Sequence, residues 1–458
     1  MTARATPLLA MLLASGCVVP QRAGFDEVAR SLSGRLEHRV HWYQGTEEDR
    51  RVAAETRRLL QQELTADSAT QLALFNNPEL QATYERLGVA QAEVVQAGLL
   101  KNPSLSLHWG FRFGDAGLDE LAGSFTAAFL DLFLMPLKKK LANAEFRRVK
   151  LEVADAVLAT VDEVKQAFFT VQASTQVVSM RRMILDAQRA ATELAVRQHE
   201  AGNISDLDLS NEQAVYLQAK LDLARAEYQL QAERERLTRL LGVWGADIDY
   251  KVAPTLPELP DEEPALAHLE RVAIEQRLDL AAAREELTLA SAALQVTKGS
   301  RVISGLSAGV QAHRDPDGPK TVGPSVDLEL PIFDQKQAEV ARLRAELRAA
   351  QHRTDALALA IRSEVRQARS RLLAARMTIE YYRKNLVPLR ERIVALSQEQ
   401  YNAMLLGVYQ LLLAKQNEIN SYREYIESVR DYWIARADLE RAIGTRLALV
   451  NRATGDRK

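Results

Sequence analysis

The sequence predicts a mainly α-helical protein with a membrane β-barrel part, built from a structural unit that occurs twice. One observation is repetition: EVKQA at residues 163–167 recurs as EVRQA at 364–368, an offset of 201 residues. The other is a change of period. In each copy, Ala- and Leu-rich helical sequence is interrupted by two stretches in which apolar and polar residues alternate, which is the pattern of half-buried strands.

The repeat extends over most of the chain. Its offsets all lie between 195 and 202, so the copies are collinear, whereas chance similarity between Ala-rich helices would scatter the offsets. The period is too long for a solenoid repeat and indicates one duplicated architecture. Further matched pairs are NPEL at 77–80 with RLDL at 277–280, Pro136 with Pro331, and RLLG at 239–242 with RAIG at 441–444.

Composition favours long helices and argues against several functions. The chain has 458 residues, 47% of them hydrophobic, with only 21 Gly and 14 Pro, which is typical of extended helices. Its formal net charge of −2 argues against a nucleic-acid partner. The seven histidines are scattered, and His38 and His41 are expected at the surface. No catalytic residue, metal ligand or cofactor is expected, because no HExxH, GxSxG or phosphate-binding glycine motif is present.

The first 17 residues are similar to a bacterial lipoprotein signal peptide. Arg4 supplies a positive charge, an apolar stretch follows, and small residues precede Cys17, the single cysteine of the chain. The resemblance implies cleavage before Cys17 and its lipidation, which would attach the chain to outer-membrane lipid. No intramolecular disulfide can form.

The helical and extended patterns divide the mature chain into four parts. Short amphipathic helices are expected from residue 25 to about 66, and a helix capped by Thr65 or Asp67 follows. Residues 137 to about 201 are predicted to form one long helix with an apolar stripe from Val149 to Val171. The expected parts are an N-terminal extension at 18–66, a first repeat at 67–246 with a hairpin at about 104–134, a Pro-rich linker at 247–267, and a second repeat at 268–450 with a hairpin at about 302–332.

The first hairpin shows which side of the predicted sheet faces lipid. Ser106, His108 and Arg112 alternate with apolar residues that are expected to face lipid, namely Leu105, Leu107, Trp109, Phe111 and Phe113. Four strands cannot close a barrel, and open sheet edges are not tolerated in lipid. Three copies would supply twelve strands, whereas two copies would give an eight-stranded barrel filled by side chains.

An ordered set of short motifs, NNPEL at 76–80, NPSL at 102–105, AGNIS at 201–205, LPELP at 256–260 and LPIFD at 330–334, resembles the TolC family of outer-membrane efflux channels. The resemblance implies a homotrimer whose twelve-stranded β-barrel continues into a long α-helical barrel. It also implies docking to a periplasmic adaptor (membrane fusion) protein and to an inner-membrane pump of the resistance-nodulation-division type. Two departures are the RLDL motif at 277–280, in which the family often has proline, and the turn at 403–407.

The two helix-turn-helix tips are the predicted gate. Asp206 and Asp208 follow the first turn and would form carboxylate rings in a trimer, and Gln410 of the second tip is a further gate candidate. The second tip is apolar, which indicates either packing between hairpins or a docking surface. We expect adaptor docking at Leu405, Leu406 and Tyr409.

Three consecutive lysines, Lys138, Lys139 and Lys140, follow Pro136. If they open a helix, they oppose its macrodipole. They are expected either to contact anionic lipid or an acidic neighbour, or to be a solvated helix end.

The predicted function is passive conduction through an outer-membrane exit channel of a tripartite efflux system. One alternative is the exit duct of a type I protein-secretion system. The other is a soluble coiled-coil scaffold in the periplasm, which would not need four alternating strands. The sequence leaves the transported substrate open.

Overall fold

The structure of the chain is a computed structural model that describes residues 19–20, 22, 24–111, 118–128, 130–261, 263, 267–299, 305–314 and 319–449. The chain divides into two compact units. Unit 1 comprises residues 1–28, 84–153 and 278–358, and unit 2 comprises residues 29–83, 154–277 and 359–458. Each unit combines segments from both copies of the repeat, which is why the copies fold together rather than as separate domains.

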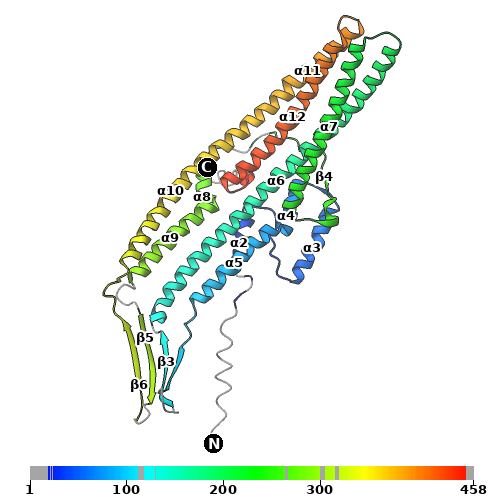
Figure 1. Cartoon of the computed structure of the whole chain (residues 1–458). Helices are drawn as coiled ribbons and strands as arrows, with labels where there is room; N and C mark the ends of the chain where they lie inside the picture. Colours follow the sequence, from blue (N-terminus) through cyan, green and yellow to red (C-terminus); the bar gives the residue numbers. More distant parts are fainter. Residues whose placement is uncertain are drawn as a thin grey trace. The chain divides into compact units, whose positions relative to one another are not determined.

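Unit 1 contains a four-stranded antiparallel sheet and the helices that lead into it (Figure 1). Sheet order is β2-β3-β5-β6, so each hairpin supplies two neighbouring strands. The apolar packing of this unit includes Tyr84, which is fully buried and meets Phe25 edge-on at 5.2 Å between ring centroids. The strands are β2 (Ser104–Phe111), β3 (Leu118–Ala128), β5 (Gly305–Arg314) and β6 (Lys320–Glu329), and the helices wholly or mostly in this unit are α5 (Pro78–Ala97) and α9 (Leu278–Gly299).

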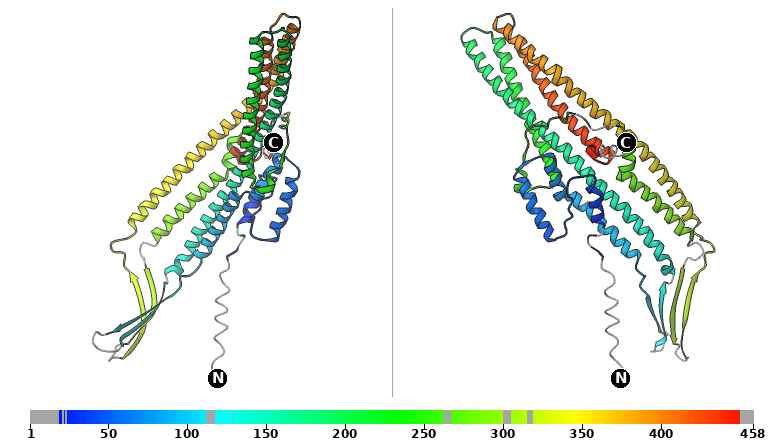
Figure 2. Two further views of the ribbon diagram at one scale, coloured as in Figure 1. Left: turned by 45° about the vertical axis from the view of Figure 1, so that its right-hand side comes forward. Right: turned by 180° about the vertical axis from the view of Figure 1, so that it is seen from behind.

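Unit 2 contains two long helical hairpins and a small parallel β1-β4 pair (Figures 1 and 2). One buried cluster in this unit includes Leu64, Phe168 and Leu237, which come from three distant parts of the sequence. Its elements are α3 (Glu47–Leu60), β1 (Glu63–Leu64), α4 (Ala66–Asn76), α7 (Asp206–Leu241), η1 (Gly245–Ile248), β4 (Lys251–Val252), α8 (Leu269–Gln276), the π-helical turn η2 (Tyr382–Leu386), α11 (Val387–Asn402) and α12 (Val408–Ile443).

Besides α5, three helices contain residues of both units: α2 (Phe25–Ser33), α6 (Leu130–Glu200) and α10 (Gln337–Tyr381). The long helix predicted from residue 137 is α6, and its predicted apolar stripe is buried throughout. That stripe consists of Val149, Val153, Val157, Val161, Val164, Phe168 and Val171. Among the described residues, we find no helix that is both long and apolar enough to cross a membrane.

The two copies break their helices at equivalent places. Asn77 ends α4 and Arg277 ends α8, both with extended backbone (ψ 115° and 127°). Opposite each break lies a glycine in the left-handed conformation, Gly242 after α7 and Gly444 after α12. A Cβ atom on Gly242 would lie 2.3 Å from the Asn76 carbonyl oxygen, and one on Gly444 would lie 3.2 Å from the Arg277 Cα. These close approaches explain why each copy has glycine there.

The first hairpin ends earlier than the sequence suggested. Its second strand stops at Ala128, and α6 begins at Leu130, so the expected hairpin end near residue 134 is wrong. The apolar residues Leu130, Phe133, Leu134 and Leu137 are spaced three, one and three residues apart, which is a helical spacing. Pro136 therefore lies inside the helix instead of opening it.

Candidate functional site: a two-faced sheet and two hairpin tips

The register of the four-stranded sheet brings residues of one kind to each face. Leu105 pairs with Phe125, Phe125 with Val310, and these partners lie on one face because directly opposed residues share a face. The next positions, such as Ser106 opposite Ser124, fall on the other face. Exposed large apolar residues on the first face are Leu105, Leu107, Trp109, Leu121, Phe125, Val310, Val322, Val326 and Leu328.

The opposite face of the sheet is polar. Ser104 and Thr126 are hydrogen-bonded across β2 and β3 at 2.7 Å, and the Ser307 hydroxyl donates to Asp327 across β5 and β6 at 3.4 Å. The faces predicted from alternation are thus observed, while contact of the apolar face with lipid remains a prediction. Phe111 belongs to β2 but its side chain is outside the described part, and Phe113 lies wholly outside it.

The outer strands of this sheet are β2 and β6. Neither has a second strand partner among the described residues, so each presents a row of backbone donors and acceptors. Neighbouring strands run antiparallel throughout, and their number is even. The β6 edge of one copy can therefore pair with the β2 edge of another without changing the antiparallel pattern.

The first hairpin tip, between α6 and α7, is held by polar side chains of its own. Ser205 caps α7: its hydroxyl accepts from the Asp208 N–H at 3.2 Å, while an Asp208 carboxylate oxygen accepts from the Ser205 N–H at 3.2 Å. The Ser205 hydroxyl also donates to Asp208, and these bonds hold the pKa of the Asp208 carboxyl below its usual value. Asp206 lies 2.6 Å from His199. Local capping thus accounts for Asp208 in a way that the sequence reading did not include.

The second hairpin tip, between α11 and α12, has a different surface. Met404 is 95% exposed and has φ 59°, and Leu405 is 79% exposed. Gly407 precedes α12 without a side-chain cap, and Gln410 is exposed. Leu406 is half-buried, and the side chain of Tyr409 lies outside the described part. Bare apolar side chains at a helix turn are unfavourable in water, which favours a docking surface.

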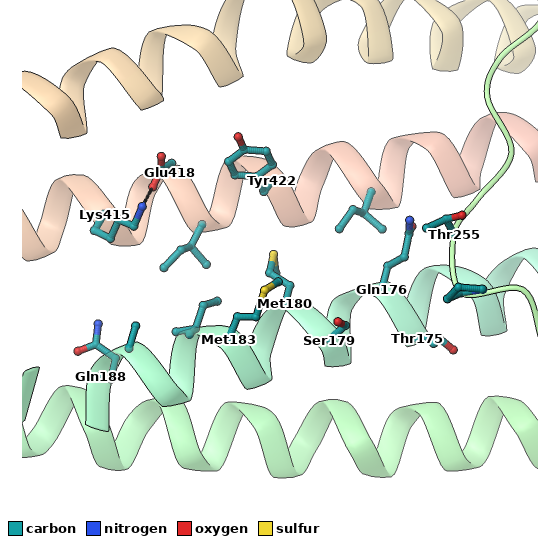
Figure 3. A pocket seen from close by; sticks show the side chains of 15 residues that line it. Thr175, Gln176, Ser179, Met180, Met183, Gln188, Thr255, Lys415, Glu418 and Tyr422 are labelled. Atoms are coloured by element: carbon teal, nitrogen blue, oxygen red, sulfur yellow. Dashed lines mark ion pairs between the residues drawn. The ribbon is translucent and has the colours of Figure 1, made fainter. Parts of the chain in front are cut away.

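Between the hairpins of unit 2, an apolar groove of about 660 Å³ runs along α6 and α12 (Figure 3). Met180 and Met183 project into it from α6, and Tyr422 is among its lining residues from α12. The Tyr422 hydroxyl donates to Glu391 on α11, and this bond, with burial, raises the pKa of Tyr422 to about 12. At the end nearer Gln188, Lys415 pairs with Glu418.

Farther from the tips, two acidic side chains meet between α6 and α12. The Gln166 amide donates to Asp162 at 2.9 Å and to Asp438 at 2.8 Å. The other oxygen of Asp162 is buried without a hydrogen-bond partner among the described residues. Burial, with the nearby Asp438 carboxylate, raises the pKa of Asp162 to about 6. Arg441, which lowers that pKa, binds Asp155 through two hydrogen bonds of 2.6 and 2.8 Å.

Little in the sequence indicates this acidic pair. Asp162 and Asp438 are 276 positions apart, and each lies in an ordinary charged helix. The only indication comes from comparing the two copies, in which EVKQA is preceded by Asp162 and EVRQA by Ser363. This difference marks Asp162 as a position where the repeat is not kept.

The three lysines occupy a different place from the one expected. Because α6 begins at Leu130, Lys138, Lys139 and Lys140 lie in its third turn. The macrodipole acts within the first turn, so the expectation that these lysines oppose it is wrong.

His38 and His41 belong to unit 2 and are not surface residues as expected. His41 is buried and lies 2.6 Å from Asp49, and the buried aromatic packing around it excludes it from the surface. The pKa of His38 is lowered, chiefly by burial. No group of three or more His, Cys, Asp or Glu side chains that could hold a metal ion occurs among the described residues.

The two-faced sheet is the arrangement expected of an outer-membrane channel subunit, and comparison with known proteins agrees. A family profile described as outer membrane efflux protein matches residues 69–243. The cobalt-zinc-cadmium resistance protein CzcC of Cupriavidus metallidurans is 24% identical over 395 residues, which cover 83% of this chain and 90% of CzcC. Protein CyaE of Bordetella pertussis is 25% identical over 378 residues, 78% of this chain and 79% of CyaE.

Solved structures show the same fold. The Campylobacter jejuni CmeC outer membrane channel superposes with a TM-score of 0.72 at 16% identity, over 83% of this chain and 85% of CmeC. Residues 69–243 thus match the outer membrane efflux protein family, and the fold is that of solved outer-membrane channels. The chain is an outer-membrane exit channel of an efflux system, as predicted from the sequence.

Proposed function

We propose that three copies of the chain form a closed channel through the outer membrane, with the β6 edge of each sheet paired to the β2 edge of the next. The observation that carries this proposal is the sheet itself, which has one apolar face, one polar face and two unpaired edges. Closure satisfies the backbone groups of the edges, which lipid cannot do. The apolar face then contacts lipid and the polar face lines the pore.

A pair of neighbouring positions on β2 tests this arrangement. Arginine at Leu107 would place a charge in lipid, at a cost of about 2–4 kcal/mol near the bilayer centre, whereas arginine at Ser106 would face water. Leu107→Arg should sharply reduce the amount of protein assembled in the outer membrane, and Ser106→Arg should leave it nearly unchanged. Equal behaviour of the two variants would contradict the assignment of the faces. Chemical cross-linking of the unmodified protein should give trimers and no larger species.

The same proposal includes a tripartite assembly. The second tip, with Leu405, Leu406 and Tyr409, docks a periplasmic adaptor, which links the channel to an inner-membrane pump of the resistance-nodulation-division type. Asp206, Asp208 and Gln410 line the periplasmic entrance. Support comes from the exposed apolar side chains of the second tip and the carboxylates of the first.

The name of the C. metallidurans relative makes divalent metal ions the first cargo to test. Deletion of the gene should lower resistance to cobalt, zinc or cadmium, and the unmodified gene should restore it. If only resistance to hydrophobic drugs changes, the cargo is organic. If only secretion of a protein changes, the chain is a type I secretion duct.

The lipid anchor completes the proposal. Cys17 lies outside the described residues, and its support is the preceding signal-like sequence. Intact mass spectrometry of the mature protein should show an N-terminal cysteine with added acyl mass. An N-terminal Met1, or Cys17 without lipid, would contradict the anchor but not the channel.

A further inference from the structure

A basic hollow of about 630 Å³ lies along one face of α6 in unit 1. Its lining residues recur at helical spacing, so a single face of the helix supplies them. They provide amide and cationic donors around a buried aromatic ring. The polar members are Lys139, Lys140, Asn143, Arg147 and Lys150, and the ring is that of Phe146.

The positive charge of this hollow is only partly neutralised. Arg147 pairs with Glu285 at 3.2 Å, and Lys150 pairs with Glu27 while its ammonium lies 4.8 Å from the centre of the Phe146 ring. Lys139 and Lys140 are exposed and form no ion pair with any described residue. Two positive charges are therefore available to an anion.

Apolar residues lie beside the hollow. The aliphatic stem of Lys139 lies against Gly98, where an added Cβ would be 3.9 Å from the lysine Cδ. Leu99 and Leu100 follow directly and are both exposed. A site that offers cations and exposed leucines side by side matches a molecule with an anionic group joined to an apolar chain.

Two separate chain connections, one from the sheet and one from Cys17, keep this hollow near the membrane surface. Lys139 is nine residues beyond the start of α6, about 14 Å at 1.5 Å per residue, and β3 of the membrane sheet ends two residues before that start. On another segment, Gly24 packs against Phe146, where a Cβ would lie 2.5 Å from the ring. Cys17 is seven residues earlier, within about 25 Å even if fully extended.

From this geometry we propose that the hollow binds the phosphate group of an anionic phospholipid, with Leu99 and Leu100 against its acyl chains. Lys139 and Lys140 supply the charge, and Asn143 is placed to donate a hydrogen bond. The proposal rests on the proposed function, which puts the sheet and Cys17 at the membrane. It adds a specific lipid site on the periplasmic side of the sheet.

The test uses the purified full-length trimer, to which short-chain phosphatidylglycerol or phosphatidylcholine is added and bound lipid is counted by native mass spectrometry. Phosphatidylglycerol should bind more tightly. The double variant Lys139→Gln with Lys140→Gln should weaken phosphatidylglycerol binding about thirtyfold, from about 1 kcal/mol for each lysine near a membrane surface. Phosphatidylcholine binding should not change. Lys220→Gln with Lys384→Gln, two exposed lysines of unit 2, is the matched control and should have no effect.

Further experiments distinguish binding of the whole lipid from binding of its phosphate group alone. Leu99→Asn with Leu100→Asn should weaken phosphatidylglycerol binding although both lysines remain. Inorganic phosphate at millimolar concentration should not displace the lipid. Complete displacement by phosphate, or equal phosphatidylglycerol binding by the lysine variant and the unmodified protein, would overturn the proposal. Failure to obtain trimers in the outer membrane would instead count against the proposed function.

Discussion

The two copies of the repeat build matching helical hairpins but finish them with opposite chemistry. The α6–α7 tip is closed by Ser205 and Asp208, which satisfy each other's backbone groups, and Asp206 pairs with His199. The α11–α12 tip has Gly407 at the capping position and exposes Met404 and Leu405. Duplicated architecture thus preserves the turn but not its surface. The second tip exposes the larger apolar surface, and this difference is why we propose that the adaptor docks there.

Reversing the chemistry of the second tip should have the largest effect. Leu405→Glu with Leu406→Glu places charges on the proposed docking surface, where desolvating an unpaired carboxylate is strongly unfavourable. Export should be lost while trimers still reach the outer membrane, as measured by resistance assays and by trimer yield. Leu207→Glu, at an exposed position of the first tip, is the control and should retain export. Equal loss of export in both variants would remove the distinction between the tips.

The helix breaks allow a second comparison of the copies. Gly242→Ala would add strain at positive φ and a collision with the Asn76 carbonyl, together about 3 kcal/mol of lost stability. Gly444→Ala has the same strain but looser surroundings, so about 1 kcal/mol is expected. Thermal unfolding of the trimers should rank them in this order. Equal losses would show that backbone strain, and not the collision, controls both positions.

The copies also differ at Asp162, whose counterpart is Ser363, and the effect of Asp162 on stability should depend on pH. Because the folded-state pKa of Asp162 is about 6 and its ordinary value is 3.8, the folded state holds this proton more tightly. The free energy of unfolding should therefore fall as pH rises from about 4 to 6, by up to about 3 kcal/mol, and then level off.

Asp162→Ser, which introduces the Ser363 of the other copy, should remove that part of the pH dependence and raise the unfolding temperature at pH 7. The measurement is unfolding temperature against pH for both proteins. An unchanged difference between pH 4 and pH 7 would show that Asp162 does not titrate in this interval. Asp222→Asn, which alters a half-buried acid of α7 paired with Arg181, is a suitable control and should keep the pH dependence of Asp162.

The smallest expected effect concerns capping. Ser205→Ala removes the cap of α7 and should destabilise that helix end by about 1 kcal/mol, seen as faster amide hydrogen exchange in its first turn. Gly407→Ser supplies a cap at the second tip and should stabilise that helix end by a few tenths of a kcal/mol. Amide hydrogen exchange there should slow accordingly. The nearest obstacle to the added side chain is the flexible end of Gln410. Export should persist in both variants, since neither alters Leu405 or Leu406.

The sequence by itself determined the features that depend on near neighbours. Alternation from Leu105 to Trp109 predicted both the strand and its two faces, because the side-chain period of a strand is two. The valine stripe from Val149 predicted the buried side of α6, because residues three and four apart share a helix face. Collinear repeats then predicted that the second half would do the same.

Tertiary structure decided what depends on residues far apart in the chain. The second copy breaks its helix at Arg277 although it has Leu278 where the first copy has Pro78, and Gly444 packs closely at that point. Asp162 has a raised pKa because folding buries it beside Asp438. Lys139 becomes part of a basic hollow because α6 begins at Leu130 and Gly24 meets Phe146. Periodicity records which face a residue occupies, but packing between distant segments sets which partner it meets there.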